Sequence, residues 1–147
     1  MKSPVHALRD CADALFRAAI ECCHQHERGS RVHAKSALKE EVAAAQRACE
    51  HCDDVLNTIV TAYEQTAADM RPSGEHEAWW HRANALWLAS REYLRRQGAS
   101  DVASAQLKEH GPGQLDALQM EYELEASALL GLRHAADAYK QNRPTAT

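Results

Sequence analysis

The sequence predicts an all-α fold, an elongated antiparallel helical bundle with four main helices. Apolar residues recur at steps of three and four along most of the chain, which is the spacing of one helix face. The chain has only 6 Gly and 4 Pro in 147 residues, and most of them lie between these apolar runs. Aromatic residues make up 5% of the chain, while Ala is abundant. This composition favours helices, and the length suits a single domain, residues 1–147.

The first helix is predicted over about residues 4–27. Ser3 suits the N-cap position, and Pro4 suits the first helical position. The apolar seam of this helix continues to His26. Gly29 followed by Ser30 is typical of a helix end and a new N-cap. We therefore expect a short turn there, with the second helix antiparallel to the first.

The second helix is predicted to be very long, over about residues 31–70. Its apolar residues follow a heptad pattern from Leu38 to Met70, and no Gly or Pro interrupts them. A helix of about 40 residues would be about 60 Å long at a rise of 1.5 Å per residue. Pro72 and Gly74 are expected to end it.

The rest of the chain is predicted to form a third helix over about residues 75–97, a short helix over about 101–109 and a fourth helix over about 114–140. The signals that separate them are Gln97–Ser100 and Gly111–Gly113. All three Trp residues fall in the third helix, where we expect them to anchor the core.

Glu125 is an unusual residue in the apolar seam of the fourth helix. A carboxylate at a core position either accepts a hydrogen bond or has a raised pKa. The indole N–H of Trp87 is one candidate donor. The alternative is that the side chain of Glu125 reaches the solvent at the edge of the seam.

The position of the predicted turn at Gly29 determines which part of the second helix packs against the first helix and which part packs against the later helices. It would let the first helix cover only the first half of the second helix, while the later helices cover the second half. The two halves would meet around Cys49 to Val55. The uncovered apolar residues then favour either a homodimer or a break in the second helix near Asp53 and Asp54, and we favour the dimer. Its predicted interface residues are Leu8, Leu15, Phe16, Ala19, Leu38 and Val42.

Charge and composition narrow the classes of partner. The net charge of −4 and pI near 6.1 argue against nucleic acid or an anionic membrane as partners. No segment has the 18 or more apolar residues of a membrane span, and the first residues lack the apolar core of a signal peptide. Five cysteines in such a chain are expected to be reduced thiols, which indicates a cytoplasmic protein.

The strongest candidates for metal ligands are Cys49 and Cys52, which lie one turn apart on a helix face. The predicted register places Cys11 near Cys49, and His6 near Cys52. A zinc site is typically built from two such pairs, and the sequence has a single CxxC. We therefore assign no metal and no cofactor and keep these four residues as weak candidates.

No catalytic residues are assigned, because the sequence contains no nucleophile elbow, P-loop or dinucleotide fingerprint. The leading hypothesis is a non-enzymatic helical interaction or adaptor module that forms a homodimer and binds an unknown protein partner. The alternative is a metal-binding bundle that uses Cys49 and Cys52 with a His or Cys of the first helix. A third hypothesis follows from residues 33–38, which faintly resemble the phosphorylated segment of histidine phosphotransfer bundles. The Gly that normally follows the Lys there is absent, and the resemblance would imply phosphorylation of His33.

Overall fold

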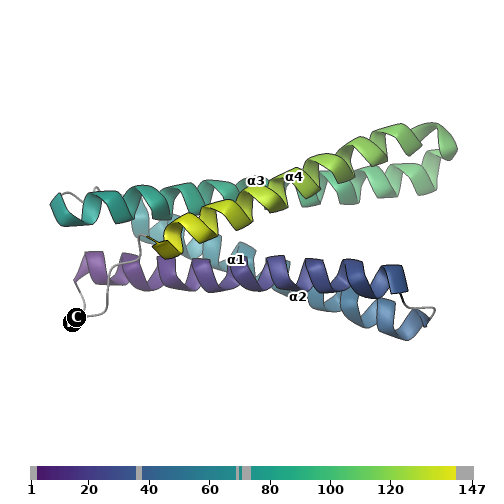
Figure 1. The fold of residues 1–147 in the computed structure, drawn as a ribbon. Coiled ribbons are helices and arrows are strands. Elements are labelled where there is room, and N and C mark those ends of the chain that lie inside the picture. The colour runs from purple at the N-terminus through teal and green to yellow at the C-terminus, as the bar shows by residue number, and fades with distance from the viewer. Residues whose placement is uncertain (1–2, 36–37, 69, 71–73, 142–147) are drawn as a thin grey trace.

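The computed structural model describes residues 3–35, 38–68, 70 and 74–141, and in these residues the protein is an antiparallel bundle of four helices without strands. The helices are α1 (Pro4–Lys35), α2 (Lys39–Ala67), α3 (Glu77–His110) and α4 (Leu115–Gln141), with 3-10 turns at Gly74–His76 and Pro112–Gln114. Figure 1 shows the elongated arrangement. The predicted all-α class is confirmed.

The predicted turn at Gly29 and Ser30 is wrong, because α1 continues through both residues to Lys35. A single glycine inside a helix costs only about 1 kcal/mol relative to alanine, so packing can override it. The packing is visible here: a Cβ atom at position 29 would lie 3.4 Å from the Sγ atom of Cys49 on α2. Gly29 therefore lies inside α1 at its contact with α2, where even a Cβ atom would be at van der Waals distance from Cys49, and it does not end the helix.

The predicted break at Gln97–Ser100 is also wrong, because α3 runs as one helix of 34 residues and includes the expected short helix. The side chain of Ser100 is buried, and its hydroxyl donates a hydrogen bond to the backbone oxygen of Glu121 on α4 (3.3 Å). Contact with α4 thus stabilises helical backbone where the local sequence alone suggested a turn.

The turn between α1 and α2 follows Lys35 and so lies later in the sequence than the predicted turn at Gly29. This changes which residues of the two helices lie side by side. The thiol of Cys22 donates to the backbone oxygen of Cys52 (3.2 Å), and the thiol of Cys11 lies 3.5 Å from the hydroxyl of Thr66. Contacts of α1 with α2 therefore extend close to the far end of α2, which overturns the expectation that the first helix covers half of the second. α2 is shorter than predicted, 29 residues, and it is continuous through Asp53 and Asp54.

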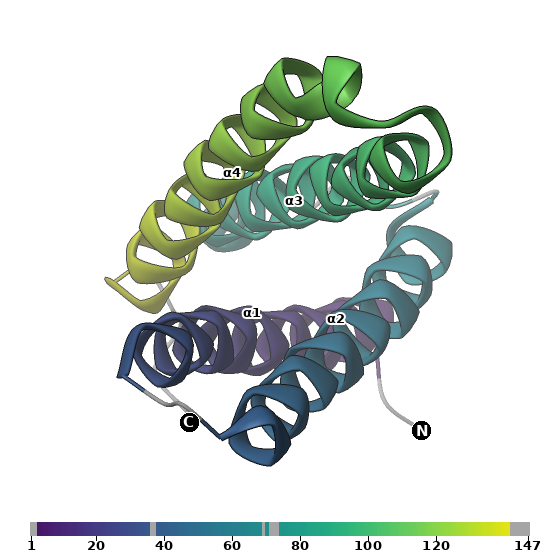
Figure 2. The ribbon, with the colours of Figure 1, turned by 90° about the vertical axis from the view of Figure 1, so that its right-hand side faces the viewer.

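The four helices form two hairpins, α1–α2 and α3–α4, whose turns lie at the same end of the molecule (Figure 1). Near the other end the hairpins pack closely around a core whose largest fully buried side chains include Tyr63, Leu86 and Tyr139. Toward the turns the hairpins diverge, as the end-on view in Figure 2 shows. We call these the closed end and the open end. The open end comprises residues 26–35, 38–49, 97–110 and 115–130.

The apolar seams of α2 and α4 are buried at the closed end and only partly covered at the open end, where Leu118 is still buried. On α2, Leu56 is fully buried, whereas Leu38 is 59% exposed. On α4, Leu132 is fully buried, whereas Leu115 is 55% exposed and Tyr122 is 52% exposed. One continuous seam on each helix thus runs from the core to solvent. None of the described helices is long and apolar enough to cross a membrane.

Candidate functional site

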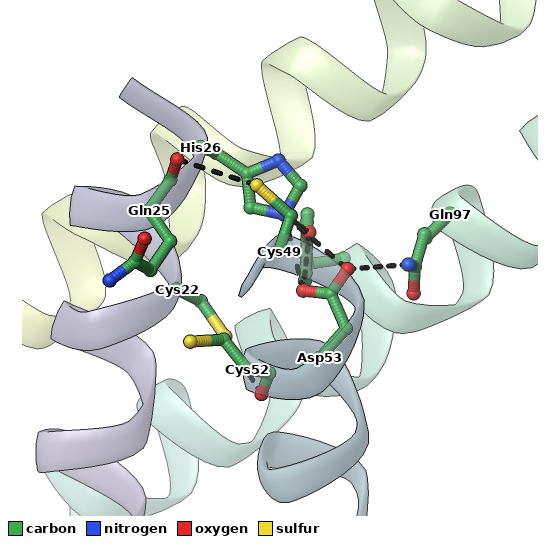
Figure 3. A network of polar contacts seen from close by, with 8 residues as sticks. Cys22, Gln25, His26, Cys49, Cys52, Asp53 and Gln97 are labelled. Carbon is green, nitrogen blue, oxygen red and sulfur yellow. Dashed lines mark hydrogen bonds and ion pairs between the residues drawn. The ribbon is translucent and has the colours of Figure 1, made fainter. Parts of the chain in front are cut away.

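A cluster of polar side chains lies where the bundle begins to open, and Asp53 is at its centre (Figure 3). Asp53 is only 3% exposed. Its carboxylate accepts hydrogen bonds from the hydroxyl of Tyr93 (2.8 Å) and from the side-chain amide of Gln97. The Nε2 atom of His26 lies 3.2 and 3.4 Å from the two carboxylate oxygens. Three helices thus meet at one buried charge.

The hydrogen-bond geometry assigns the protons in this cluster. The hydroxyl of Tyr93 donates to Asp53 and also contacts Nε2 of His26, so Nε2 carries the proton and donates. Burial, together with the neighbouring charge of Asp53, raises the pKa of Tyr93. The phenol therefore stays protonated and serves as a donor at neutral pH. The rings of His26 and Tyr93 meet edge to face at 5.6 Å.

Sequence reasoning missed Asp53 as the centre of this cluster. Asp53 stands at steps of four and three between Cys49 and Leu56, which places its side chain on the buried stripe of α2. An acidic residue at such a position is a signal for a buried polar partner. The partners themselves, Tyr93 and Gln97, depend on the register between helices, which local periodicity does not provide.

The structure separates the weak metal candidates. The thiol of Cys49 donates to the backbone oxygen of Gln25 (3.3 Å), and Cys52 lies beside Cys22. Cys11 lies instead beside Thr66, and His6 contacts Ser3 at the start of α1, so the predicted proximity of these two residues to Cys49 and Cys52 is wrong. Among the described residues, no three His, Cys, Asp or Glu side chains are placed to hold a metal ion.

The thiols near this cluster are poor nucleophiles and poor metal ligands as they stand. Burial raises the pKa of Cys22, Cys23, Cys49 and Cys52, and for Cys22 the charge of Asp53 adds to the effect. A thiol with a raised pKa remains protonated at neutral pH, whereas both reactions require the thiolate. Cys22, Cys49 and Cys52 act as small apolar groups in the packing between α1 and α2, while Cys23 borders the hollow between α1 and α4.

Most of the predicted dimer-interface residues lie inside the chain. Leu8, Leu15 and Ala19 are fully buried, and the ring of Phe16 packs 5.6 Å from that of Tyr139. The three fully buried residues cannot contact a second copy while the bundle is intact, whereas Phe16 is only partly buried. The two predicted interface residues on α2 also remain accessible, exposed Leu38 and partly buried Val42.

Two adjoining hollows form a cleft at the open end. One, of about 440 Å³, lies between α1 and α4, and the other, of about 660 Å³, lies between α1, α2 and Tyr122. His26, Ser30 and Tyr122 border both hollows. Because His26 is also held by Asp53, the polar cluster forms the inner boundary of the cleft. The other lining residues are mainly small or apolar and include Ala34, Val42, Ala45, Ala126, Leu129 and Leu130.

Glu125 borders the first hollow and is partly buried. Burial raises the pKa of its carboxyl group, and a hydrogen bond from Ser100 partly offsets this effect. The indole of Trp87 does not reach it; it donates to Glu64 instead (3.1 Å). Of the three indoles, Trp79 is the most buried and donates to the hydroxyl of Tyr139 (3.3 Å).

Comparisons with models of protein families, with curated proteins and with solved structures found no match for this chain.

Proposed function

We propose that this protein is a non-enzymatic helical interaction module that binds a second copy of itself through the open end. The observation that supports this proposal is the change in exposure along α2 and α4, where each apolar seam leaves the core and continues into solvent. The proposed interface keeps Leu38 and Val42 from the sequence-based prediction. It replaces the buried residues of α1 with the exposed residues of α4.

The amount of exposed apolar surface is the physical argument for a partner. Burying one large aliphatic or aromatic side chain contributes about 1.5–3 kcal/mol. Monomeric globular proteins rarely expose large contiguous apolar patches. The open end nevertheless exposes more than half of each of several large apolar side chains. These residues are Leu38, Val102, Leu115, Met120, Tyr122 and Leu130.

A second copy fits this surface because the open end offers both halves of an interface. It has a cleft with many small and apolar lining residues, and two exposed apolar side chains, Tyr122 and Leu130, border that cleft. In a two-fold symmetric dimer the same patch contacts itself, so each copy can fill the cleft of the other. No additional protein is required to cover these residues.

The polar cluster supports a structural role more than a catalytic one. Both oxygens of Asp53 accept hydrogen bonds from neighbouring helices, and the carboxylate is almost completely excluded from solvent. Such a network favours one register of the helices. The burial of the carboxylate also keeps a substrate from reaching it. A cytoplasmic location remains part of the proposal, since it suits the five free cysteines.

Sedimentation velocity at micromolar concentration tests the proposal. We expect the wild-type chain to sediment as a dimer and Leu38→Glu to sediment as a folded monomer. Leu88→Glu is the matched control, because Leu88 is 56% exposed but lies on α3 outside the open end. It should leave the dimer intact. A wild-type monomer, or equal effects of both substitutions, would overturn the proposal.

A further inference from the structure

The hollow between α1 and α4 has apolar walls and a small number of polar groups. It measures about 440 Å³ and is the first of the two hollows that form the cleft. Small-molecule sites typically measure about 300–1,000 Å³. The apolar walls include Leu129 and Leu130, and the polar lining residues include His26 and Glu125. Apolar walls with a few convergent polar groups are typical of a ligand site.

The ring of His26 is held in one orientation, which leaves its second nitrogen available to a ligand. The Nε2 atom contacts Asp53 and Tyr93 and carries the proton. In the neutral ring the Nδ1 atom is then a hydrogen-bond acceptor, and it has no partner among the described residues. Figure 3 shows this nitrogen on the side of the ring away from Asp53. Because the Nε2 edge faces the buried carboxylate, the Nδ1 side of the ring is the side that can meet a ligand in the hollow.

Glu125 supplies a second acceptor, from α4. Its carboxylate lies close enough to His26 and Asp53 for their charges to act on its pKa. Glu125 forms no ion pair with another residue of the described chain. The other charged residues on the wall, Glu27 and Arg133, pair with each other (3.3 Å). The hollow therefore has one carboxylate whose charge no Lys or Arg of the described chain balances.

We infer that this hollow binds a small organic cation, a protonated amine with an apolar tail. The ammonium group donates to the carboxylate of Glu125 and to Nδ1 of His26, while the tail lies against Leu129 and Leu130. The ring of Tyr122, which borders both hollows, adds an aromatic surface of the kind that attracts organic cations. The inference goes beyond the proposed function, because every residue in it belongs to one copy of the chain.

The chemistry of the lining disfavours other classes of ligand. A metal ion needs several ligands, and among the described residues no three His, Cys, Asp or Glu side chains are placed to hold one. An anion would meet the carboxylate of Glu125, while Arg133 is already paired with Glu27. A neutral ligand would bury that carboxylate further without a counter-charge, which is costly. An ammonium group removes this cost and favours the charged form of Glu125.

Three probes of equal length test the inference: hexylamine, which is protonated at neutral pH, hexanol and hexanoate. The chain used is Leu38→Glu, which the proposed function expects to be a monomer, so that a second copy does not cover the hollow. Calorimetry should show that hexylamine binds about tenfold more tightly than hexanol, because a charge-assisted hydrogen bond forms only with the amine. Propylamine should bind about tenfold more weakly than hexylamine, since it buries less apolar surface.

Glu125→Gln removes the charge and keeps the shape of the side chain, so it should bring the Kd of hexylamine to within about twofold of that of hexanol. Glu123→Gln is the matched control, because Glu123 is exposed on the same helix and does not line the hollow. It should bind hexylamine like the parent chain. Circular dichroism verifies that each variant is helical. NMR gives a second readout, since the Nδ1 resonance of His26 should move as its lone pair accepts a hydrogen bond from hexylamine.

The outcomes separate this inference from the proposed function. Equal affinities for hexylamine and hexanol, tighter binding of hexanoate, no saturable binding of hexylamine or an unchanged Nδ1 resonance would each overturn the inference. Equal losses in Glu123→Gln and Glu125→Gln would also overturn it, since they would indicate general attraction to an acidic protein. None of these results bears on dimerisation. A wild-type chain that stays monomeric overturns the proposed function and leaves the amine site standing.

Discussion

The two ends of this bundle are built from the same helices and the same heptad seams, yet they differ in how those seams are covered. At the closed end all four helices contribute buried side chains, such as Leu8, Leu56, Leu86 and Leu132. At the open end the hairpins diverge (Figure 2). There Leu38 of α2 and Leu115 and Tyr122 of α4 are each more than half exposed. Heptad periodicity therefore identifies a surface that packs against something. It does not identify whether the partner lies in the same chain.

The polar cluster around Asp53 marks the boundary between the two ends. Asp53 holds α1, α2 and α3 together through His26, Tyr93 and Gln97. Buried polar networks that are fully hydrogen-bonded favour one helix register over others. Beyond this layer the contact between the hairpins gives way to the cleft.

The largest expected difference between the ends is in the cost of removing a leucine. Leu86→Ala at the closed end removes a fully buried side chain and should lower the free energy of unfolding by about 2–5 kcal/mol. Leu115→Ala at the open end removes a side chain that is 55% exposed and should change the stability of the monomer by less than about 0.5 kcal/mol. Urea unfolding in dilute solution measures both. Similar losses at the two positions would show that the open end is packed within the chain.

A second comparison concerns neighbouring acidic residues on α2. Asp53→Ala leaves the hydroxyl of Tyr93 and the amide of Gln97 without their acceptor, so we expect a loss of about 3 kcal/mol. Asp54 is exposed, and Asp54→Ala should change stability by less than about 0.5 kcal/mol. Thermal unfolding followed by circular dichroism compares them. If Asp53→Ala were as stable as the wild type, the cluster would not determine the register.

The smallest expected effect is the contribution of Glu125 to the free energy of unfolding, which changes with pH in a defined direction. Burial raises the pKa of Glu125 above its ordinary value of 4.5, so the folded state holds this proton more tightly than the unfolded state does. Its contribution to stability is therefore present in acid and is lost as the pH rises through the folded-state pKa. Glu125→Gln should raise stability at neutral pH by about 0.5 kcal/mol, a value discounted for the partial exposure of the carboxylate.

The pH dependence distinguishes this effect from a general change in charge. Urea unfolding at a series of pH values between acid and neutral should show a smaller decline for Glu125→Gln than for the wild type. Glu123→Gln is the control. It alters an exposed carboxylate two residues before Glu125 on the same helix, and it should follow the wild-type curve. Identical curves for all three chains would contradict the assignment of a penalty to Glu125.

Local periodicity was sufficient to predict the fold class and the faces that the helices bury. It was correct for the seam from Leu8 to Cys22 on α1 and for the seam of α4 at Leu132 and Tyr139, because a helix buries residues three and four apart. It failed at Gly29 and at Gln97–Ser100, where contact between helices keeps weak helix formers in helical conformation.

The candidate site was harder to predict from the sequence than the fold was. One misplaced turn at Gly29 shifted the register of α1 against α2 by between four and five turns of helix, because Cys11 lies beside Thr66, 17 residues beyond the expected Cys49. That shift placed Cys11 near Cys49 and left Leu8 and Leu15 without partners. In the structure Cys11 faces Thr66, and both leucines lie in the core. The dimer stays a prediction, and it is now argued from the exposed side chains of Leu38 and Tyr122 and not from helix lengths.

Hydrogen exchange at increasing protein concentration tests the central claim most directly. If a second copy covers the open end, the amide protons of residues 38–49 and 115–130 should exchange more slowly as the concentration rises. Amides of the closed end, around Leu56 and Leu86, should exchange at the same rate throughout. Exchange rates at the open end that do not change with concentration, or a slowing confined to the closed end, would contradict the account.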